Sequence, residues 1–361
     1  MQMRSTRRCA VASLLWTLIH GQLGAVVVFG PGGADRNASA PTGSLADSGW
    51  QWTGHFNAFC GVPVGRSSFL TAAHIGGEVG DRFDWNGRSY RTVGFETDAA
   101  SDLRLWHVSG EFGSTTPIVL QDLRIGESVM ILGRGTARGT PILAERVDDS
   151  PILAGWRWGS LDGRLRWGTN TIAHRIDGAS IGLYGPLAGC AFDGGIGNDE
   201  ACISLGDSGG PLFVRRSQEW QLAAIHFAVE AAFNTSETGT GENGTLFDYR
   251  GLYRQSNSAW VLEPIEGTSP VPAVFFSTRV MPRRTWLDAS IAKAPAAPTL
   301  EQAADPQGPF IPAVGSNHDP VARTFTLDPS AGSTFFQLRG TAGLVIVRVH
   351  LQSGQVVIQY D

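Results

Sequence analysis

The stretch Leu205-Gly206-Asp207-Ser208-Gly209-Gly210-Pro211 says more about this chain than any other part of it. Nucleophilic catalysis by serine requires a hydroxyl on a tight turn, with backbone N–H groups directed at the developing oxyanion. Glycines on both sides of Ser208 allow the unusual dihedral angles and the close backbone approach that such a turn needs. A glycine-rich turn between two strands, with Asp207 as a turn former, is the simpler alternative.

Two earlier segments carry residues that could serve such a serine. The run Leu70-Thr71-Ala72-Ala73-His74 is a β-type stretch that ends in a histidine after two small residues. In Ser101-Asp102-Leu103-Arg104-Leu105-Trp106, an aspartate opens a strand whose leucines alternate. Each segment also has an ordinary structural explanation, because aspartate is common at strand edges and a histidine after a strand is usually structural.

In the chain order His, Asp, Ser, these segments resemble the T-A-A-H, D-I-A-L and G-D-S-G-G-P motifs of the trypsin/chymotrypsin superfamily. The resemblance covers roughly residues 50–265 and is greatest to secreted bacterial enzymes. It implies two six-stranded antiparallel β-barrels with the site between them. It also implies His74 as general base and acid, Asp102 as its orienting carboxylate and Ser208 as the nucleophile. The amides of Gly206 and Ser208 would form the oxyanion hole.

The chain departs from the animal enzymes of this superfamily at three places. Ile75, not a cysteine, follows the catalytic histidine, and no I-V-G-G-like sequence precedes Trp50. No obvious newly cut N-terminal amine is therefore available to pair with Asp207, and trypsin-style activation is not expected. No aspartate stands where trypsin places one in its specificity pocket. Asp98 is the alternative to Asp102 as the acid of the triad.

The resemblance places the substrate pocket beside the nucleophile and along the strand predicted at Trp220–Ala228. The predicted pocket residues are Ile203, Ser204, His226, Phe227 and Ala228. A histidine near position 226 would suit a glutamate-specific enzyme, whereas a core histidine on a strand is the simpler interpretation.

Composition and pattern agree with an all-β protein. The chain has 361 residues, of which 42% are hydrophobic, 17% charged and 46 are glycine. Short β-type runs separated by turns indicate a barrel or a sandwich, and one short helix is expected at Ser256–Leu262. A linker is predicted over Ala289–Pro320, followed by a hairpin that closes at Ser353-Gly354. The net charge of −5 argues against nucleic acid as a partner.

The N-terminus has the pattern of an export signal. A positive start precedes the apolar run Cys9–Ile19, and small residues allow cleavage near Ala25. An uncleaved membrane anchor is the alternative. We therefore expect a secreted or periplasmic protein without a membrane span after signal removal. The expected division is a signal at 1–25, a flexible leader at 26–48, a protease domain at 49–266 and a β-rich C-terminal region at 267–361.

Three cysteines remain after signal removal, an odd number. Cys190 and Cys202 bracket a glycine-rich loop and are the expected disulfide. Cys60 would then be a buried free thiol or an intermolecular partner. Metal-binding spacings such as C-x-x-C do not occur, so no metal and no cofactor are expected.

The predicted function is that of a monomeric serine endopeptidase acting on proteins or peptides. A catalytically silent binding protein on the same fold is the first alternative. A serine esterase is the second, because the turn around Ser208 also satisfies G-x-S-x-G. That fold needs helical crossovers between strands and places its acid and histidine after the serine.

Overall fold

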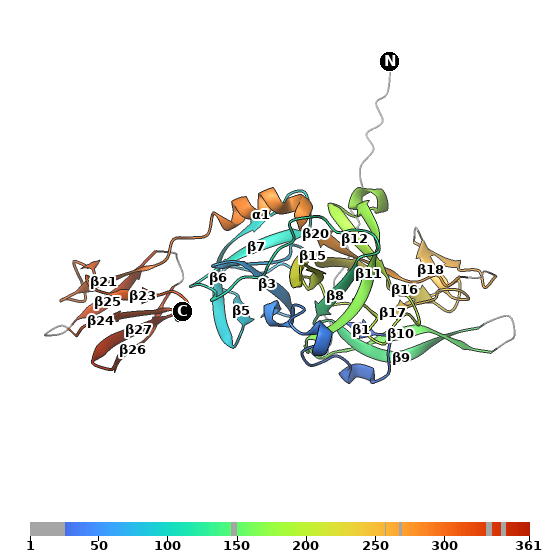
Figure 1. The fold of residues 1–361 in the computed structure, drawn as a ribbon, viewed down its shortest axis with the longest axis horizontal. Coiled ribbons are helices and arrows are strands. Elements are labelled where there is room, and N and C mark those ends of the chain that lie inside the picture. The colour runs from blue at the N-terminus through green and yellow to red at the C-terminus, as the bar shows by residue number, and fades with distance from the viewer. Residues whose placement is uncertain (1–25, 146–149, 257, 267–268, 330–333, 341–343) are drawn as a thin grey trace, which may run out of the picture.

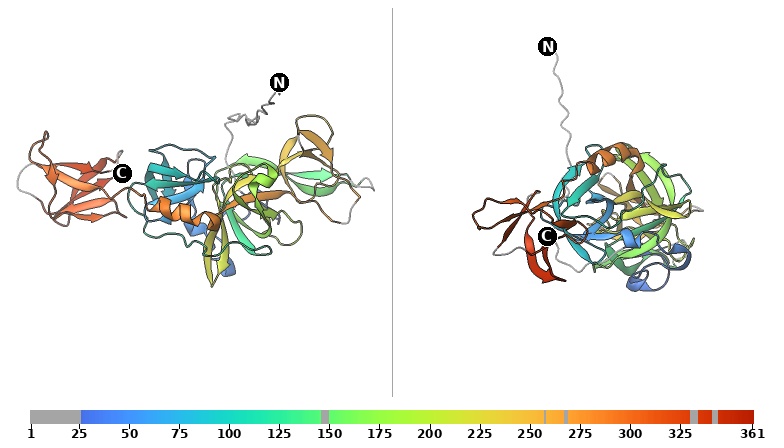
Figure 2. Two further views of the ribbon diagram at one scale, coloured as in Figure 1. Left: turned by 90° about the horizontal axis from the view of Figure 1, so that it is seen from above. Right: turned by 60° about the vertical axis from the view of Figure 1, so that its left-hand side comes forward.

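The computed structural model describes residues 26–145, 150–256, 258–266, 269–329, 334–340 and 344–361. Strands dominate, and α1 (Arg284–Ile291) is the one α-helix in these ranges. The predicted signal lies outside the described residues. No helix within the described ranges has the length and apolar character to cross a membrane. Two closed six-stranded barrels lie side by side at the centre, with an additional sheet at one end and the C-terminal tail at the other (Figures 1 and 2).

The first barrel is built around aromatic side chains. Phe69 and Phe83 stack with ring centroids 4.0 Å apart, and Trp106 and Phe56 pack beside them at 5.5 Å from each other. All four are fully buried, and such rings contribute both buried area and specific ring contacts. The barrel comprises, in the order of pairing, β2 (Gly54–Phe56), β3 (Phe59–Gly65), β4 (Ser68–Ala72), β7 (Leu103–Val108), β6 (Arg88–Thr97) and β5 (Arg82–Trp85).

The second barrel has an aliphatic core in which alternating residues of each strand point inward. Its strands pair in the order β11 (Arg166–Asp177), β12 (Pro186–Ala191), β20 (Val274–Arg279), β15 (Glu219–Val229), β14 (Pro211–Arg216) and β8 (Ser128–Gly133). Every pairing between these strands is antiparallel. The two barrels confirm the predicted all-β, chymotrypsin-like fold.

An additional six-stranded sheet extends from the second barrel. Its strands pair in the order β19 (Ala259–Leu262), β18 (Tyr253–Ser256), β16 (Ala232–Asn234), β17 (Glu242–Leu246), β10 (Ile152–Leu161) and β9 (Thr136–Ala144). The helix predicted at Ser256–Leu262 is wrong, because this segment belongs to the β18–β19 hairpin. Ser258 has a φ of 66°, which a turn accommodates and a right-handed helix does not. The Trp260 indole N–H donates to the Gly239 carbonyl and holds the hairpin on the sheet.

The segment expected as a loose leader packs on the second barrel. β1 (Val27–Val28) pairs with β13 (Ala201–Cys202), and the Phe29 ring contacts Trp156, Phe192 and Phe247. Short 3₁₀ turns follow at Gly33–Asp35, Gly43–Leu45 and Trp50–Trp52. Two further 3₁₀ turns lie at Gly178–Ile181 and Met281–Arg283.

The C-terminal tail forms two small sheets with their own core, in which Ile358 and Tyr360 are fully buried. One sheet comprises β22 (Ile311–Pro312), β21 (Thr299–Ala303) and β25 (Phe335–Arg339). The other comprises β23 (Asn317–Asp319), β24 (Thr324–Leu327), β27 (Gln355–Tyr360) and β26 (Ile346–Gln352). The predicted hairpin closes at Ser353-Gly354, where both residues have positive φ. The predicted linker over Ala289–Pro320 is only partly irregular, because it contains the end of α1 and β21 to β23.

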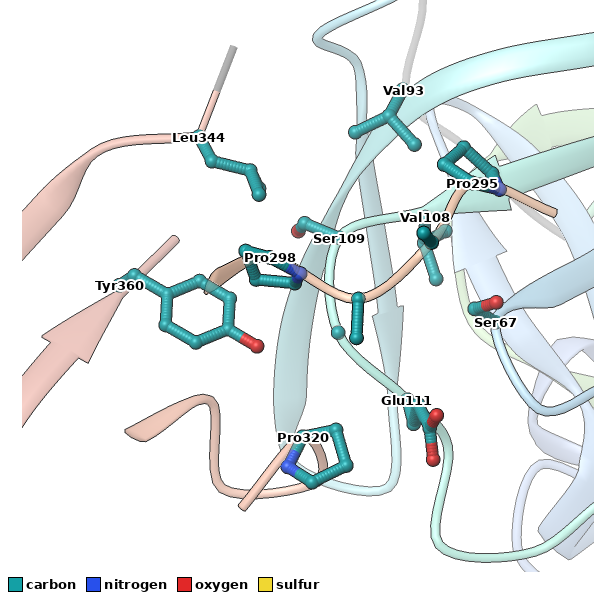
Figure 3. Close-up of a pocket in the computed structure, with 13 residues that line it drawn as sticks. Ser67, Val93, Val108, Ser109, Glu111, Pro295, Pro298, Pro320, Leu344 and Tyr360 are labelled. Carbon is teal, nitrogen blue, oxygen red and sulfur yellow. The ribbon is translucent and has the colours of Figure 1, made fainter. Parts of the chain in front are cut away.

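The tail docks on the first barrel. The Asp361 carboxylate lies 2.5 Å from the Arg323 guanidinium and 3.5 Å from that of Arg91, which belongs to β6. The Glu111 N–H donates to the Pro320 carbonyl at 2.9 Å. Pro295 and Pro298 run through this junction between the barrel surface and Tyr360 (Figure 3). The proline-rich connection therefore lies against both bodies, as its restricted backbone favours.

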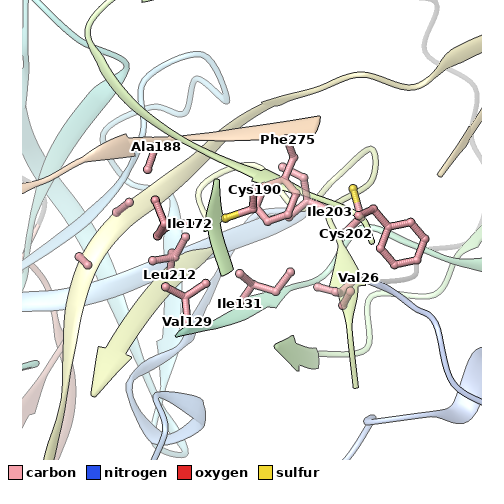
Figure 4. Packing of buried hydrophobic residues seen from close by; sticks show 14 of the residues in the cluster. Val26, Val129, Ile131, Ile172, Ala188, Cys190, Cys202, Ile203, Leu212 and Phe275 are labelled. Atoms are coloured by element: carbon pink, nitrogen blue, oxygen red, sulfur yellow. The ribbon is translucent and has the colours of Figure 1, made fainter. Parts of the chain in front are cut away.

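The predicted disulfide between Cys190 and Cys202 is absent, and Cys60 is also a buried free thiol. Cys190 lies on β12, between β11 and β20, whereas Cys202 lies on β13, which pairs with β1. Both side chains belong to the apolar core of the second barrel (Figure 4). Burial raises the pKa of all three thiols, that of Cys60 to about 12, so they behave as small apolar groups.

Glu200 next to β13 is a buried carboxyl with a testable effect on stability. Burial, the main cause, raises its pKa to about 8, and its Oε1 has no hydrogen-bond partner within the described ranges. The unfolded chain releases this proton near pH 4.5 and the folded protein near pH 8, so the free energy of unfolding falls as pH rises between these values. Glu200→Gln should therefore stabilise the protein by roughly 3 kcal/mol at pH 9 and by much less at pH 4. Urea unfolding at both pH values measures this, and equal effects at both would contradict it.

Candidate functional site

Ser208 lies on a tight turn between β13 and β14. The backbone of this turn requires glycine at two positions. Gly206 has a φ of 94° and Gly209 one of 76°, both in the region that other residues avoid. A β-carbon on Gly209 would lie 2.3 Å from Thr71 Oγ1 and 2.8 Å from the Cys60 carbonyl oxygen. The turn is thereby pressed against the first barrel, and the Ser208 side chain remains partly exposed at the junction of the barrels.

His74 follows β4 of the first barrel and faces Ser208. Its Nε2 lies 2.8 Å from Ser208 Oγ, and its Nδ1 lies 2.5 Å from Asp102 Oδ2. The His74 backbone N–H donates to the other carboxylate oxygen at 2.9 Å, so one aspartate fixes both the main chain and the ring. The Asp102 side chain is fully buried, whereas the imidazole is 28% exposed. The structure thus brings the three predicted residues together in one hydrogen-bonded chain.

Asp102 is held by the neighbouring strands. It precedes β7, and the Ala73 N–H donates to its carbonyl at 3.0 Å, next to the β4–β7 pairing. The alternative acid, Asp98, points elsewhere. Its carboxylate forms two hydrogen bonds with the Arg283 guanidinium, at 2.6 and 2.8 Å, and accepts the Ser101 hydroxyl at 2.5 Å. Asp98 therefore connects this loop to the segment before α1, and Asp102 contacts the imidazole.

Tyr184 is a member of the site that the sequence did not reveal. Its hydroxyl donates to Asp102 Oδ1 at 3.1 Å, and its ring lies edge-on to Phe227 at 5.4 Å. Burial, followed by the nearby Asp102 charge, raises the pKa of Tyr184 and keeps the hydroxyl protonated as a donor. Tyr184 lies in a glycine-containing loop 82 residues after Asp102, and no motif or periodicity marked it.

The predicted oxyanion hole retains free donors. In the part of the chain that the structure describes, the Gly209 and Gly210 N–H groups are used by the His226 and Asp207 carbonyls. The N–H groups of Gly206 and Ser208 have no acceptor there. Two unused amides on a turn beside a serine hydroxyl are the donors that an oxyanion requires.

The predicted pocket residues separate into two groups. Ile203, Ser204 and His226 are buried: Ile203 packs in the core, Ser204 Oγ contacts Asp207 Oδ2 at 3.0 Å, and His226 Nδ1 contacts Ser277 Oγ at 2.9 Å. Burial lowers the pKa of His226 to about 3, so this histidine is neutral. Phe227 and Ala228 are only half-buried, and the Phe227 ring lies 5.7 Å from that of His74.

Asp207 organises the turn from beneath. Its Oδ1 accepts the Gly135 N–H at 2.7 Å and the Val26 N–H at 3.2 Å, while Oδ2 accepts the Ser204 N–H at 2.7 Å. Burial raises the pKa of this fully buried carboxyl to about 6, although all these N–H donors oppose the shift. The N-terminal segment therefore reaches Asp207, because the backbone nitrogen of Val26 contacts it. Figure 4 shows Val26 within the core of the second barrel.

The described residues contain no group of three or more histidine, cysteine, aspartate or glutamate side chains that could hold a metal ion. The site itself offers the Ser208 hydroxyl, the His74 imidazole, the buried Asp102 carboxylate and two free amides. Such a set performs acyl transfer through a serine nucleophile.

Two solved structures, both of serine-protease-type proteins, align with this chain. The mouse brain serine protease neuropsin aligns with a TM-score of 0.39 and 12% identity, over 68% of this chain and 96% of its own. Kallikrein-related peptidase 10, in complex with Zn²⁺, aligns with a TM-score of 0.38 and 14% identity, over 68% and 98%. No protein-family model matches the chain, and no curated protein matches it in sequence. The two closed barrels, not these alignments, establish the trypsin-like fold.

Proposed function

We propose that this protein is a serine endopeptidase that hydrolyses peptide bonds through an acyl-enzyme on Ser208. The observation that carries the proposal is the continuous chain from Ser208 Oγ through the imidazole to Asp102, with contacts of 2.8 and 2.5 Å. Hydrogen-bond contact between nucleophile and base, and between base and orienting carboxylate, is the arrangement that acyl transfer requires.

In the proposed mechanism, His74 Nε2 removes the Ser208 proton as Oγ attacks the substrate carbonyl. The negative oxygen of the tetrahedral intermediate accepts hydrogen bonds from the Gly206 and Ser208 N–H groups. The imidazolium, stabilised by the buried Asp102, then protonates the leaving amine, and the acyl-enzyme forms. Water attacks the ester with His74 as base again, and the acid product leaves.

The substrate backbone is proposed to lie along the end of β15. The Glu230 N–H donates to Val274 on β20, so the polar backbone groups of Val229 point to the opposite edge. That edge continues from Phe227, which contacts the His74 ring. An extended peptide placed there would add a strand beside the nucleophile.

Two alternatives are less well supported. An α/β-hydrolase esterase requires a parallel sheet with helical crossovers, whereas all strand pairs of the described sheets are antiparallel. A silent binding protein would need a blocked or incomplete site. The Ser208 side chain is partly exposed, and its hydroxyl contacts His74, which in turn contacts Asp102.

A fluorophosphonate probe tests the proposal directly. The probe should label the protein at Ser208, and labelling should disappear in Ser208→Ala and His74→Ala. Peptide-library cleavage then reports whether labelled protein acts on peptide bonds. A folded protein that neither labels nor cleaves, under conditions in which a known protease does both, would favour the silent alternative.

We further propose that export and activation are one event. Cleavage after Ala25, the predicted signal boundary, would turn the Val26 nitrogen into an amino group 3.2 Å from the buried Asp207 carboxylate. The resulting buried ion pair would stabilise the Ser208 turn. The mature protein would then be secreted or periplasmic and would begin at Val26.

Tyr184→Phe tests the role of the additional hydrogen bond to Asp102. Removing a hydroxyl that donates to a buried carboxylate should lower kcat about tenfold while KM stays near its original value, because the phenolic oxygen contacts the triad. Peptidase kinetics measure both constants. An unchanged kcat, or a change confined to KM, would show that Tyr184 does not position Asp102.

A further inference from the structure

A cavity of about 480 Å³ lies between the two barrels. Trp50 and Trp85 contribute to it from the side of the first barrel, and Arg134, Arg164 and Leu165 from the second. Arg134 lies between Gly133 and Gly135, and the Gly135 N–H donates to the Asp207 carboxylate. A β-carbon on Gly206 would be 3.7 Å from the Arg134 carbonyl oxygen. Arg134, which lines the cavity, thus lies on the Gly206 side of the turn, whereas Gly209 and Gly210 bond to β15 on the other side.

The charge lining this cavity is positive. Among the described residues that line it none is acidic, and the two charged groups are the guanidinium groups of Arg134 and Arg164. Arg164 pairs with Asp35, but the Asp35 side chain is 80% exposed, so water screens this pair strongly. Two neighbouring carboxylates already have arginine partners, Asp162 with Arg166 and Asp84 with Arg82, and the buried Asp207 is held by backbone N–H groups. His55 also lies near Arg134, and burial lowers its pKa, so this histidine adds no positive charge at neutral pH.

Arg134 lines the cavity with a guanidinium that is held in place. Its Nη1 donates to the Gly163 carbonyl at 2.7 Å, the group also contacts the Cys60 thiol, and its Nε is buried without a partner among the described residues. A planar guanidinium matches the geometry of a carboxylate. The Trp85 indole N–H is already used by the Gln51 carbonyl, and this wall of the cavity also presents Gln51, Thr53 and Asn86.

We propose that this cavity binds a carboxylate of the substrate, on the side of the scissile bond that leaves with the amine. The inference rests on the proposed peptidase function, because it places a peptide across Ser208 with one side along β15. The other side then passes over Gly206 toward Arg134. The carboxylate could belong to an aspartate or glutamate side chain or to the C-terminus of a short peptide. Arg134 would bind it directly, and Arg164 would add a weaker, exposed charge.

Binding to the inactive Ser208→Ala protein tests this without relying on turnover. Three peptides of one sequence are compared: a C-terminal acid, a C-terminal amide, and an amide with aspartate two residues after the cleaved bond. At least one of the two carboxylate peptides should bind about tenfold more tightly than the neutral amide. Which one gains identifies the source of the carboxylate. Equal affinities for all three peptides, or no binding of any at millimolar concentration, would overturn the proposal.

Substitutions at the cavity test whether its arginines cause the preference for carboxylate peptides. In the Ser208→Ala background, Arg134→Gln should reduce the tenfold preference to about twofold or less, and Arg134→Lys should keep part of it. Arg164→Gln, at an exposed side chain that should not disturb folding, should reduce it by about twofold. Arg66→Gln is the matched control, since its exposed guanidinium pairs with Glu111 and does not line the cavity. A preference that survives both Arg134→Gln and Arg164→Gln would contradict the assignment.

The inference and the proposed function can fail separately. Suppose that wild-type protein labels with fluorophosphonate and cleaves neutral peptides, but that binding shows no preference for a carboxylate. The proposed peptidase function then stands, and the carboxylate site is refuted. If Ser208→Ala protein prefers carboxylate peptides but wild-type protein neither labels nor cleaves, the carboxylate site stands and the peptidase function is refuted.

Discussion

Asp102→Asn should lower kcat about ten-thousandfold while the protein remains folded. An amide at this position keeps the shape of the side chain but presents an N–H where the imidazole needs an acceptor. The 2.5 Å contact to His74 Nδ1 would then favour the tautomer whose Nε2 carries a proton and cannot accept the one on Ser208. A loss of this size accompanies the same change in other Ser-His-Asp triads. Peptide hydrolysis by the purified variant measures it.

Asp98→Asn is the matched control for this prediction. Asp98 contacts Arg283 and Ser101 and no atom of the imidazole, so the change should act mainly on stability. The two variants should therefore separate, with a catalytic defect in one and a lower unfolding midpoint in the other. A small catalytic loss in Asp102→Asn together with a large one in Asp98→Asn would mean that the acid of the triad has been misassigned.

Blocking the Val26 amino group should reduce kcat/KM about 100-fold or more. A protein that begins at Val26 places an ammonium group beside Asp207, whereas one extra residue before it leaves a neutral amide there. Leaving one partner of a buried ion pair without the other costs about 3–5 kcal/mol. Asp207 is fully buried and holds Gly135 and Ser204, so the strain would fall on the Ser208 turn. Kinetics of the two purified forms measure the difference.

The pH dependence supplies a second readout of the same ion pair. An α-amino group ordinarily has a pKa near 8, and pairing with a buried carboxylate raises it. The stabilisation of the Ser208 turn by this ion pair is present below the pKa of the amino group. It is lost as the amino group deprotonates at higher pH. Activity of the form that begins at Val26 should therefore fall at alkaline pH, whereas the extended form should stay low throughout. A Val26→Ile protein beginning at residue 26 should behave like the unmodified mature form. Equal activity of the extended and mature forms would refute this activation mechanism.

Much of the fold followed from local patterns that tertiary contacts did not override. The strand after Asp102 and the hairpin that closes at Ser353-Gly354 were both predicted, and β7 and the β26–β27 pair confirm them. Ser256–Leu262 was predicted as a helix because its apolar residues are adjacent in sequence, a pattern that does not distinguish a short helix from a hairpin. The hairpin prevails because cross-strand pairing and the Trp260 contact to Gly239 are non-local.

The cysteine pairing and the pocket residues show what spacing cannot determine. Cys190 and Cys202 are close in sequence, but they lie on strands of different sheets, and a disulfide depends on where two β-carbons meet. Ser204 and His226 lie near the nucleophile along the chain, yet both point inward to partners of their own. Side-chain direction on irregular segments depends on the packing around them.

The sequence by itself determined the nature of the nucleophilic turn, because the requirement for glycine at Gly206 and Gly209 is local and is written in adjacent residues. Chain order was sufficient to suggest His74 and Asp102 as partners for Ser208. Only the tertiary structure decided that Tyr184 contacts Asp102, that the Val26 nitrogen contacts Asp207, and that Arg134 lines a cavity between the barrels. The first two contacts join residues 82 and 181 positions apart, and the third arises where two barrels meet, so no local pattern encodes them.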